Sequence, residues 1–394
     1  MYDVIVAGAG PAGSTCAREC ARQGLRTLLL DKDTFPRSKP CGGAVSARAL
    51  SYLDFPLPES IIERECFGAR IHYGNRIVEA HKESRIAVLV SRTNFDFLLA
   101  DKAVEGGAHF LPGEQVIDVQ EKRDGVEVAS RTASYQARFL IGADGVHSRV
   151  GQILRPSFQK DETALALVSH VPCGDQEIEK RLDYVDYYFG TAPMGYGWLF
   201  PHRCYYSVGI AGLASRFLKS REALTDLARS FNVEVTDIQG HFIPFGGKRR
   251  TIARGRILLT GDAAGFVDPF YGEGITYAIL SGRLAAQAII YAVRNQKHPS
   301  CAAAQYCREA EQRITKQLRV ALRMMNLLER YPRLFLRIFF DHPAALERYL
   351  DITAGIIDYR RFQRWILTRL PFLLLSRTIR NQNAAKTTER SNSF

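Results

Sequence analysis

MYDVIVAGAGPAGSTCARECARQGLRTLLLD, residues 1–31, is the stretch of sequence that decides the fold. An apolar strand leads into a glycine-rich segment, which is followed by a helix and by a second apolar strand that ends at Asp31. Gly8 permits a tight turn, Gly10 lets the backbone approach a pyrophosphate at the helix N-terminus, and Gly13 allows the helix to pack closely on the strand. Asp31 is placed to accept hydrogen bonds from ribose hydroxyls. This order of strand, glycine loop, helix, strand and acid predicts a dinucleotide-binding unit.

The length and the cysteines limit the class of protein. A chain of 394 residues is long enough for two domains, or for one large domain with an insertion. Its eight cysteines are scattered, with no Cys-x-x-Cys pair and no Cys/His cluster at metal-ligand spacing, so we expect neither a disulfide framework nor a metal site. The first strand begins at Tyr2 and leaves no room for a leader, so we expect a cytoplasmic protein. The longest uncharged apolar stretches are far shorter than the roughly 18 residues of a spanning helix.

The formal charge of +12 is unevenly distributed along the chain. Residues 355–394 hold eight Lys or Arg against two acids, a net charge of +6, interleaved with Phe362, Trp365, Ile366 and the apolar run 372–375. Basic residues among aromatic and aliphatic ones are typical of segments that bind an anionic membrane surface. The charge also suggests a nucleic-acid-binding protein, but the sequence has no recognisable binding module. We therefore expect a membrane surface as a partner, and no nucleic acid.

A second group of basic residues lies just before this segment. Its members are spaced by three, four or seven residues, which places them along one face of a predicted helix. They are Lys316, Arg319, Arg323, Arg330, Arg333 and Arg337. Pro332 must kink or interrupt that helix. The pattern is consistent either with a solvated face or with a face that docks on an acidic surface.

The first part of the chain continues the dinucleotide-binding pattern. Residues 94–104 predict a helix, and residues 115–141 predict strands with a hairpin at Asp124-Gly125. Residues 156–247 contain alternating and aromatic segments, which predict an antiparallel sheet. The chain then returns to the first domain with a strand at 257–260 and an apolar helix over 274–293.

Three separated glycine-rich segments carry a family resemblance. They are Gly8 to Gly13, Gly142-Ala143-Asp144-Gly145, and Gly261-Asp262-Ala263-Ala264-Gly265. Together they resemble the FAD-dependent monooxygenase and reductase superfamily of the p-hydroxybenzoate hydroxylase type, over roughly the first three hundred residues. The resemblance implies noncovalently bound FAD as the cofactor, with the first segment at the pyrophosphate.

The same resemblance implies individual cofactor contacts. Asp31, where many members have Glu, is expected at the adenosine ribose, Asp262 at the ribityl chain, and Arg92 near the diphosphate and the ribityl chain. The full set of cofactor-binding residues that it implies is Gly8, Gly10, Pro11, Ala12, Gly13, Asp31, Lys32, Cys41, Gly42, Arg92, Asp144, Gly261, Asp262, Gly272, Gly274 and Ile275. Residues 266–274 precede the apolar helix, so backbone N–H groups and a positive helix end can approach a reduced flavin ring. Glu273 fits a helix N-terminal acid better than a catalytic residue.

Two further motifs narrow the family. Pro193-Met194-Gly195-Tyr196-Gly197-Trp198-Leu199-Phe200-Pro201 resembles the Tyr-x-Trp-x-Phe-Pro signature of geranylgeranyl reductases, which saturate prenyl double bonds. Lys39-Pro40-Cys41-Gly42-Gly43 resembles the Cys-Gly-Gly loop of the same group. On a strand, the aromatic residues of the signature share one face, where they either line an apolar ligand or fill the core. Cys41 is either an active-site thiol at the flavin or a turn residue. The catalytic candidates are Cys41, Tyr196 and Trp198, with no metal ligand.

These observations predict an α/β protein with three parts. A discontinuous Rossmann-like FAD-binding domain covers residues 1–70, 91–155 and 248–310, and an inserted antiparallel-sheet substrate domain covers 71–90 and 156–247. A helical, basic C-terminal region covers residues 311–394.

The expected activity is FAD-dependent saturation of C=C bonds in an isoprenoid chain on a lipid, quinone or pigment precursor. NAD(P)H or ferredoxin is the expected reductant, and the inner face of a membrane is the expected location. The alternative is an aromatic monooxygenase or halogenase on the same scaffold.

Overall fold

The glycine-rich N-terminal stretch forms the expected unit in the computed structural model, which describes residues 1–174 and 183–369. Strand β1 (Tyr2–Ala7) and strand β2 (Thr27–Asp31) pair in parallel, and helix α1 (Pro11–Arg22) connects them. Gly8 has a φ of 102°, which favours glycine, and a Cβ on Gly13 would lie 1.8 Å from the Gly8 carbonyl oxygen. The two glycines are therefore required by the turn and by the packing of α1 on it.

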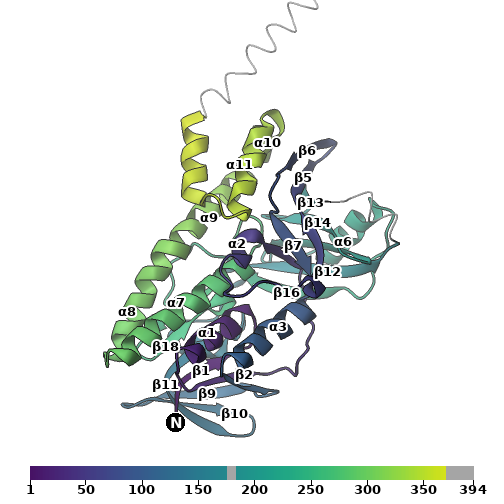
Figure 1. Ribbon diagram of the computed structural model, residues 1–394. Helices are drawn as coiled ribbons and strands as arrows, with labels where there is room; N and C mark the ends of the chain where they lie inside the picture. The colour runs from purple at the N-terminus through teal and green to yellow at the C-terminus, as the bar shows by residue number, and fades with distance from the viewer. Residues whose placement is uncertain (175–182, 370–394) are drawn as a thin grey trace, which may run out of the picture.

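The first sheet extends this unit in both directions. Its strands follow the order β17 (Ala253–Arg254), β18 (Ile257–Leu259), β11 (Ser134–Gly142), β1, β2 and β8 (His109–Pro112), and β9 (Val116–Glu121) and β10 (Val126–Ser130) continue from β11. Pairing is parallel from β18 to β8. Helices α1, α3 (Arg92–Glu105) and α7 (Ile275–Arg294) pack on this sheet (Figure 1). The predicted helices at 94–104 and 274–293, and the hairpin at Asp124-Gly125, are confirmed.

A second, seven-stranded sheet contains the middle of the chain. Its order is β16 (Gln239–Pro244), β12 (Thr163–Pro172), β15 (Tyr205–Leu213), β14 (Tyr196–Pro201), β13 (Tyr184–Phe189), β5 (Gly68–Tyr73) and β6 (Arg76–His81). All its pairs are antiparallel except β13 with β5. Helix α6 (Ser220–Arg229) packs on β15 and β12.

A small third sheet lies between the other two. It has the order β3 (Ala44–Ser46), β7 (Ala87–Val90), β4 (Ile62–Cys66). Strand β7, within the predicted substrate segment 71–90, thus pairs with two strands of the predicted FAD-binding segment 1–70. The shorter helical elements are α2 (Ala47–Leu50), α4 (Arg149–Leu154), η1 (Glu59–Ile61), η2 (Lys160–Glu162) and η3 (Gly261–Ala264).

The C-terminal region is helical: α8 packs on α7 and beside the first sheet, and the later helices gather at the end of the molecule opposite the N-terminus (Figure 1). It contains α8 (Pro299–Ala310), the π-helical turn η4 (Glu311–Thr315), α9 (Lys316–Arg330), α10 (Pro332–Asp341), α11 (Pro343–Thr353) and a helix at 359–369. The predicted interruption at Pro332 is confirmed, so Arg333 and Arg337 lie on a different helix from the basic residues of α9. The predicted single basic face is therefore wrong.

The same region corrects one expectation about membrane contact. Phe362 is only 1% exposed and belongs to the core beside Tyr349 and Tyr359, so it is not available for insertion into a bilayer. The apolar run 372–375 lies outside the described residues. Among the residues that are described, α7 alone is long and apolar enough to cross a membrane, and 78% of its most apolar stretch is buried inside the protein.

Candidate active site

A large cavity connects the loops of the first sheet to the face of the second sheet. It encloses about 1750 Å³ of empty space, its open mouth included. Lys39, Arg92, His241 and Asp262 line one end, which we name the charged end. Tyr187, Phe189, Tyr196, Trp198, Phe200 and Phe270 line the other, the aromatic end. One continuous space therefore joins polar loops to an apolar interior.

A lysine and a histidine beside Asp262 organise the charged end. Lys39 Nζ lies 3.6 Å and His241 Nε2 lies 3.8 Å from Asp262 Oδ2. Burial alone would raise the pKa of the Asp262 carboxyl, but Lys39, His241 and Arg92 outweigh it and hold that pKa well below its ordinary value. Asp262 is thus a carboxylate and can accept hydrogen bonds from hydroxyl groups.

Arg92 is fixed by a second carboxylate. Its Nε and Nη2 each donate to a different oxygen of Asp96 at 2.8 Å, and Arg37 Nη2 lies 3.1 Å from the same carboxylate. Asp96 is fully buried, and although burial opposes its ionisation, the two arginines keep its pKa below the ordinary value. This arrangement holds guanidinium groups rigidly beside the glycine loop.

The N-terminus of α1 has the features of a diphosphate site, and the residues present fit FAD. The N-cap residue of α1 is Gly10, which has no side chain to bind the first N–H groups of the helix, and the first turn contains no acid. A Cβ on Gly10 would meet only the Arg37 guanidinium, at 3.6 Å, so the space in front of the helix is open. Free backbone N–H groups, the helix dipole and nearby cations favour a phosphate anion. Arg37, Lys39 and Arg92 would hold the diphosphate half, and Asp262 the ribityl hydroxyls.

The structure divides the predicted cofactor residues into two groups. Those that line the cavity are Pro11, Cys41, Gly42, Arg92, Asp262, Gly272, Gly274 and Ile275. Those that lie outside its lining are Gly8, Gly10, Ala12, Gly13, Asp31, Lys32, Asp144 and Gly261. Gly261 nevertheless adjoins α1, because a Cβ there would lie 3.0 Å from Ala12 Cβ.

Two of the outlying acids bind backbone groups. Asp31 Oδ2 accepts from Ala9 N at 2.6 Å, which ties the end of β2 to the glycine loop. Asp144 Oδ2 accepts from Arg149 N at 2.8 Å and from Val150 N at 3.2 Å, which caps α4. Lys32 is exposed. Whether Asp31 and Asp144 also contact the cofactor stays a prediction.

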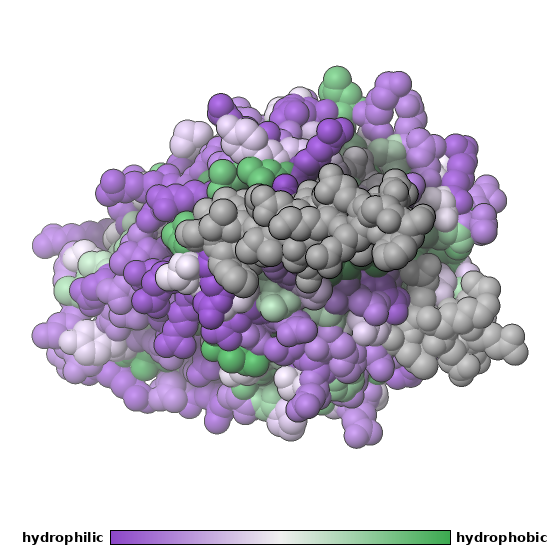
Figure 2. All heavy atoms as spheres, turned by 90° about the horizontal axis from the view of Figure 1, so that it is seen from above, coloured by the Kyte–Doolittle hydropathy of each residue, from purple (hydrophilic) through white to green (hydrophobic). Residues whose placement is uncertain are grey.

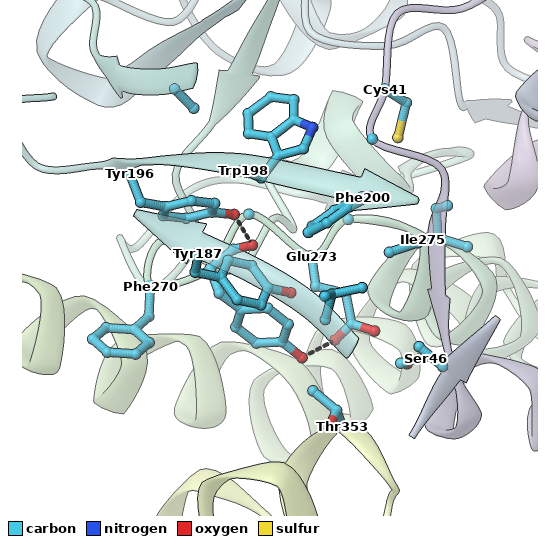
Figure 3. Close-up of a pocket in the computed structure, with 18 of the residues that line it drawn as sticks. Cys41, Ser46, Tyr187, Tyr196, Trp198, Phe200, Phe270, Glu273, Ile275 and Thr353 are labelled. Carbon is cyan, nitrogen blue, oxygen red and sulfur yellow. Dashed lines mark hydrogen bonds between the residues drawn. The ribbon is translucent and has the colours of Figure 1, made fainter. Parts of the chain in front are cut away.

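Strand β14 supplies a wall of the aromatic end (Figure 3). Tyr196, Trp198 and Phe200 are each buried and line the cavity, with Tyr187 of β13 packed edge-on against Tyr196 and Phe200. The Tyr196 hydroxyl donates to the Tyr271 carbonyl oxygen, and Trp198 Nε1 donates to Ser207 Oγ at 3.3 Å. Their polar atoms are therefore bonded inside the protein, which leaves ring surfaces toward the cavity.

The Cys41 loop crosses this wall. A Cβ on Gly42 would lie 2.9 Å from the Phe200 ring, and Gly43 has a φ of 75°. Both glycines are thus needed for the loop to lie flat on the signature residues. Cys41 lines the cavity, and its sulphur accepts a hydrogen bond from Gly43 N at 3.4 Å. A catalytic role for Cys41 stays a prediction.

Two buried acids lie in the segment just before α7. Glu273 precedes the first turn of α7, and its carboxylate accepts from Tyr271 OH at 2.6 Å and from the Thr276 hydroxyl. Asp268 is 1% exposed, and burial raises its pKa to about 7. Its Oδ1 accepts from Phe270 N at 2.7 Å, so it shapes the loop that leads to Gly272.

Helices of the C-terminal region close the far side of the cavity. Leu336 and Phe339 of α10 and Leu346 and Leu350 of α11 line it. The sequence indicated a basic helical region here but not its contact with the cavity. The helical spacing of the apolar residues did not indicate which part of the protein these helices pack against.

Comparisons with known proteins agree with this geometry. Residues 1–229 match a family model described as an FAD binding domain. The chain is 31% identical over 314 residues to the geranylgeranyl diphosphate reductase of Rhodobacter capsulatus. The alignment covers 75% of this chain and 77% of that protein.

Solved structures share the fold. A geranylgeranyl bacteriochlorophyll reductase-like protein from Thermoplasma acidophilum superimposes with a TM-score of 0.78 at 24% identity, covering 95% of this chain and 98% of that one. A flavin-dependent brominase superimposes with a TM-score of 0.73 at 20% identity, covering 93% and 98%. The scaffold is thus shared with halogenases, whereas the sequence similarity extends to a reductase. The chain belongs to the geranylgeranyl reductase family of FAD-dependent oxidoreductases.

Proposed function

We propose that this protein saturates C=C bonds in an isoprenoid chain carried by a lipid, a quinone or a pigment precursor. The observation that carries the proposal is the single cavity that runs from the charged end to the aromatic end. A flexible apolar chain suits the aromatic end, because rings and aliphatic side chains offer contact area without unpaired polar atoms. The family relative from Rhodobacter capsulatus, by its name, acts on geranylgeranyl diphosphate.

The residues of the cavity divide the chemical work. Bound FAD supplies hydride when its ring is reduced. Lys39, Arg92 and Asp262 of the charged end, together with Arg37 beside it, would hold the cofactor, and the aromatic end would exclude water from the alkene. An alkene has no oxygen on which charge can collect, so hydride and proton transfers must be closely coupled in a dry site. Cys41 lines the cavity at the loop where the proton would be delivered or the alkene positioned.

The test is the mass of the product. FAD-loaded protein is incubated with geranylgeranyl diphosphate and, separately, with a geranylgeranyl lipid, with NAD(P)H or reduced ferredoxin offered as reductant. We expect products heavier by two hydrogens for each double bond. A product that gains oxygen or halogen, together with oxygen consumption, would contradict the proposal and support the monooxygenase or halogenase alternative.

We also propose that the C-terminal end binds an anionic membrane surface. Arg360, Arg361 and Arg364 are exposed on the helix at 359–369, and Leu367 is 57% exposed beside them. Viewed from this end, the visible surface is mostly hydrophilic, with separate hydrophobic patches (Figure 2). Each basic residue near anionic lipid contributes about 1 kcal/mol. An isoprenoid substrate would then reach the cavity from the bilayer.

Point substitutions test this attachment better than truncation, because deletion after Asp358 would remove the buried Tyr359 and Phe362. The triple variant Arg360→Gln, Arg361→Gln and Arg364→Gln should lose sedimentation with vesicles that contain phosphatidylserine, while FAD content stays unchanged. Unchanged sedimentation would contradict the proposal for these residues.

A further inference from the structure

A buried histidine lies directly behind the Cys41 loop. His202 follows β14, and its side chain is 1% exposed. Its Nδ1 lies 2.5 Å from Glu63 Oε2, and its Nε2 lies 3.0 Å from the Gly42 carbonyl oxygen. A carboxylate and a carbonyl are both acceptors, and only the imidazolium carries a hydrogen on each ring nitrogen. The geometry therefore places His202 between two acceptors, the Glu63 carboxylate on one side and the Gly42 carbonyl of the loop on the other.

The surroundings support the contact between Glu63 and His202. Tyr205 stacks on His202, with ring centroids 4.4 Å apart, and its hydroxyl donates to the same Glu63 oxygen at 3.0 Å. Burial opposes ionisation of Glu63, but hydrogen bonds from His202 and Tyr205 outweigh it and keep its pKa below the ordinary value. Other titratable or charged groups nearby include His170, whose ring centroid lies 6.4 Å from that of His202, and Arg203, which donates to the Ile62 carbonyl. The Arg92 guanidinium lies beside the Cys41 side chain itself.

The peptide between Gly42 and Gly43 connects His202 to Cys41. In a trans peptide the carbonyl oxygen and the N–H group point in opposite directions. Here the oxygen faces His202 Nε2, and the N–H group donates to Cys41 Sγ at 3.4 Å. A Cβ on Gly43 would lie 2.7 Å from His202 Cε1, so the close approach depends on glycine. Linked hydrogen bonds polarise one another, so a hydrogen bond accepted by the carbonyl oxygen strengthens the N–H donor on the other side of the peptide.

We propose that the Glu63–His202 pair orients and polarises the Gly42–Gly43 peptide, which in turn positions the Cys41 sulphur in the cavity. Glu63 and His202 are positioning residues, because they act on Cys41 through this peptide. The contacts among Glu63, His202, the Gly42–Gly43 peptide and Cys41 do not depend on a substrate. Only the use of Cys41 in alkene reduction rests on the proposed function.

The molecule contains a matched control. His72 Nε2 lies 2.7 Å from Asp186 Oδ1, and the His72 ring stacks on Tyr188 with centroids 4.2 Å apart. This histidine has the same kind of carboxylate and tyrosine neighbours in the same sheet. It lies on β5 and does not line the cavity, so its substitution should not affect the Cys41 loop.

The experiment measures alkylation of Cys41 by iodoacetamide in FAD-loaded protein, with peptide mass spectrometry separating Cys41 from the other seven cysteines. His202→Phe keeps a ring for stacking but removes both hydrogen bonds. His202→Lys removes the ring but keeps a charged donor. The thiolate is the attacking form, and a polarised N–H donor stabilises it. We expect about tenfold slower alkylation in His202→Phe, recovery of most of the rate in His202→Lys, and no change in His72→Phe.

Other outcomes overturn the proposal. An unchanged or faster rate in His202→Phe would show that the histidine does not support the sulphur through the peptide. A rate in His202→Lys as slow as in His202→Phe would show that a charged donor at this position does not restore the reactivity of the sulphur, and it would refute donation to the Gly42 carbonyl oxygen as the cause of the effect. Glu63→Gln provides a second route if His202→Phe is not recovered with FAD: slower alkylation supports the charged pair, and an unchanged rate refutes it. Because the assay needs no isoprenoid, failure of the proposed substrate class would leave its result intact.

Discussion

The charged end and the aromatic end of the cavity are built by opposite means. At the charged end, cations and carboxylates lie within hydrogen-bond or ion-pair distance, and glycine loops bring the backbone close. At the aromatic end, side chains from β13, β14, α10 and α11 converge, and the Tyr196 hydroxyl and Trp198 Nε1 are hydrogen-bonded to other protein atoms. Under the proposed function the difference separates two tasks: the first end retains a charged cofactor, and the second excludes water around an apolar chain. Substitutions at the two ends should therefore have separable effects.

Arg92→Met should have the largest effect, because it removes the Arg92 guanidinium from the buried ion pair with Asp96. Among the described residues, Asp96 would keep Arg37 alone as an ion-pair partner, in a site that is 0% exposed. Removing one partner of a buried ion pair costs about 3–5 kcal/mol. Thermal denaturation should show this loss together with loss of FAD.

Lys102→Met is the matched control for that variant. Lys102 forms a surface pair with Glu105, and such pairs contribute about 0–1 kcal/mol. Equal melting temperatures for Arg92→Met and Lys102→Met would mean that the buried pair does not hold the charged end.

Asp268→Asn tests the loop that joins the two ends through pH dependence. In the folded protein the pKa of Asp268 is raised to about 7 from an ordinary value of 3.8. Between these values the folded state holds a proton that the unfolded state has released. The contribution of this group to stability is therefore complete below the lower pKa and is lost as the pH rises through about 7. Each pH unit between the two pKa values lowers the free energy of unfolding by about 1.4 kcal/mol.

The measurement is the melting temperature of both proteins across this pH range. The asparagine side chain of the variant carries no titratable group. The melting temperature of Asp268→Asn minus that of the wild type should therefore increase as the pH rises. A difference that stays constant with pH would show that Asp268 is ionised throughout.

Asp262→Ala should weaken FAD binding while leaving the aromatic end intact. The variant loses a carboxylate that lies beside Lys39 and His241 and would accept from the ribityl hydroxyls. Each charge-assisted hydrogen bond contributes about 1.5–3 kcal/mol, so affinity should fall about 10-fold to 100-fold. Fluorescence titration of the apoprotein measures it, with Asp226→Ala, an exposed acid of α6, as the control. Unchanged affinity would mean that the ribityl site lies elsewhere.

Trp198→Phe should have the smallest of these effects and should be confined to the substrate. The smaller ring removes part of the wall, so kcat/KM for an isoprenoid should fall about threefold to tenfold, or about 0.6–1.4 kcal/mol. FAD affinity should be unchanged. Trp365→Phe is the control, because Trp365 packs against the same core without lining the cavity. Equal kcat/KM for the two variants would remove Trp198 from the substrate wall.

The part of the fold that could be predicted from the sequence depends on local requirements. The glycine loop is recognisable because Gly8 needs a positive φ and Gly13 has no room for a Cβ. The signature strand is recognisable because alternation along six residues places its aromatic side chains on one face. Both signals are complete within a short stretch of chain.

The remaining contacts depend on residues far apart in the sequence. Glu63 and His202 are 139 residues apart, and Arg37 meets Asp96 only because a loop folds back on α3. The prediction that Phe362 is available for membrane insertion was wrong for a related reason. Its segment is amphipathic, and the sequence does not show whether protein or lipid covers the apolar side.

The most direct test of the account is a single turnover without oxygen. Holoenzyme is reduced with dithionite, excess reductant is removed, and geranylgeranyl diphosphate or a geranylgeranyl lipid is added under anaerobic conditions. The account predicts that the absorbance of oxidised flavin returns at a rate that depends on the isoprenoid, and that the product gains two hydrogens for each flavin reoxidised. Flavin that stays reduced with every isoprenoid and is reoxidised only when oxygen is admitted would contradict it.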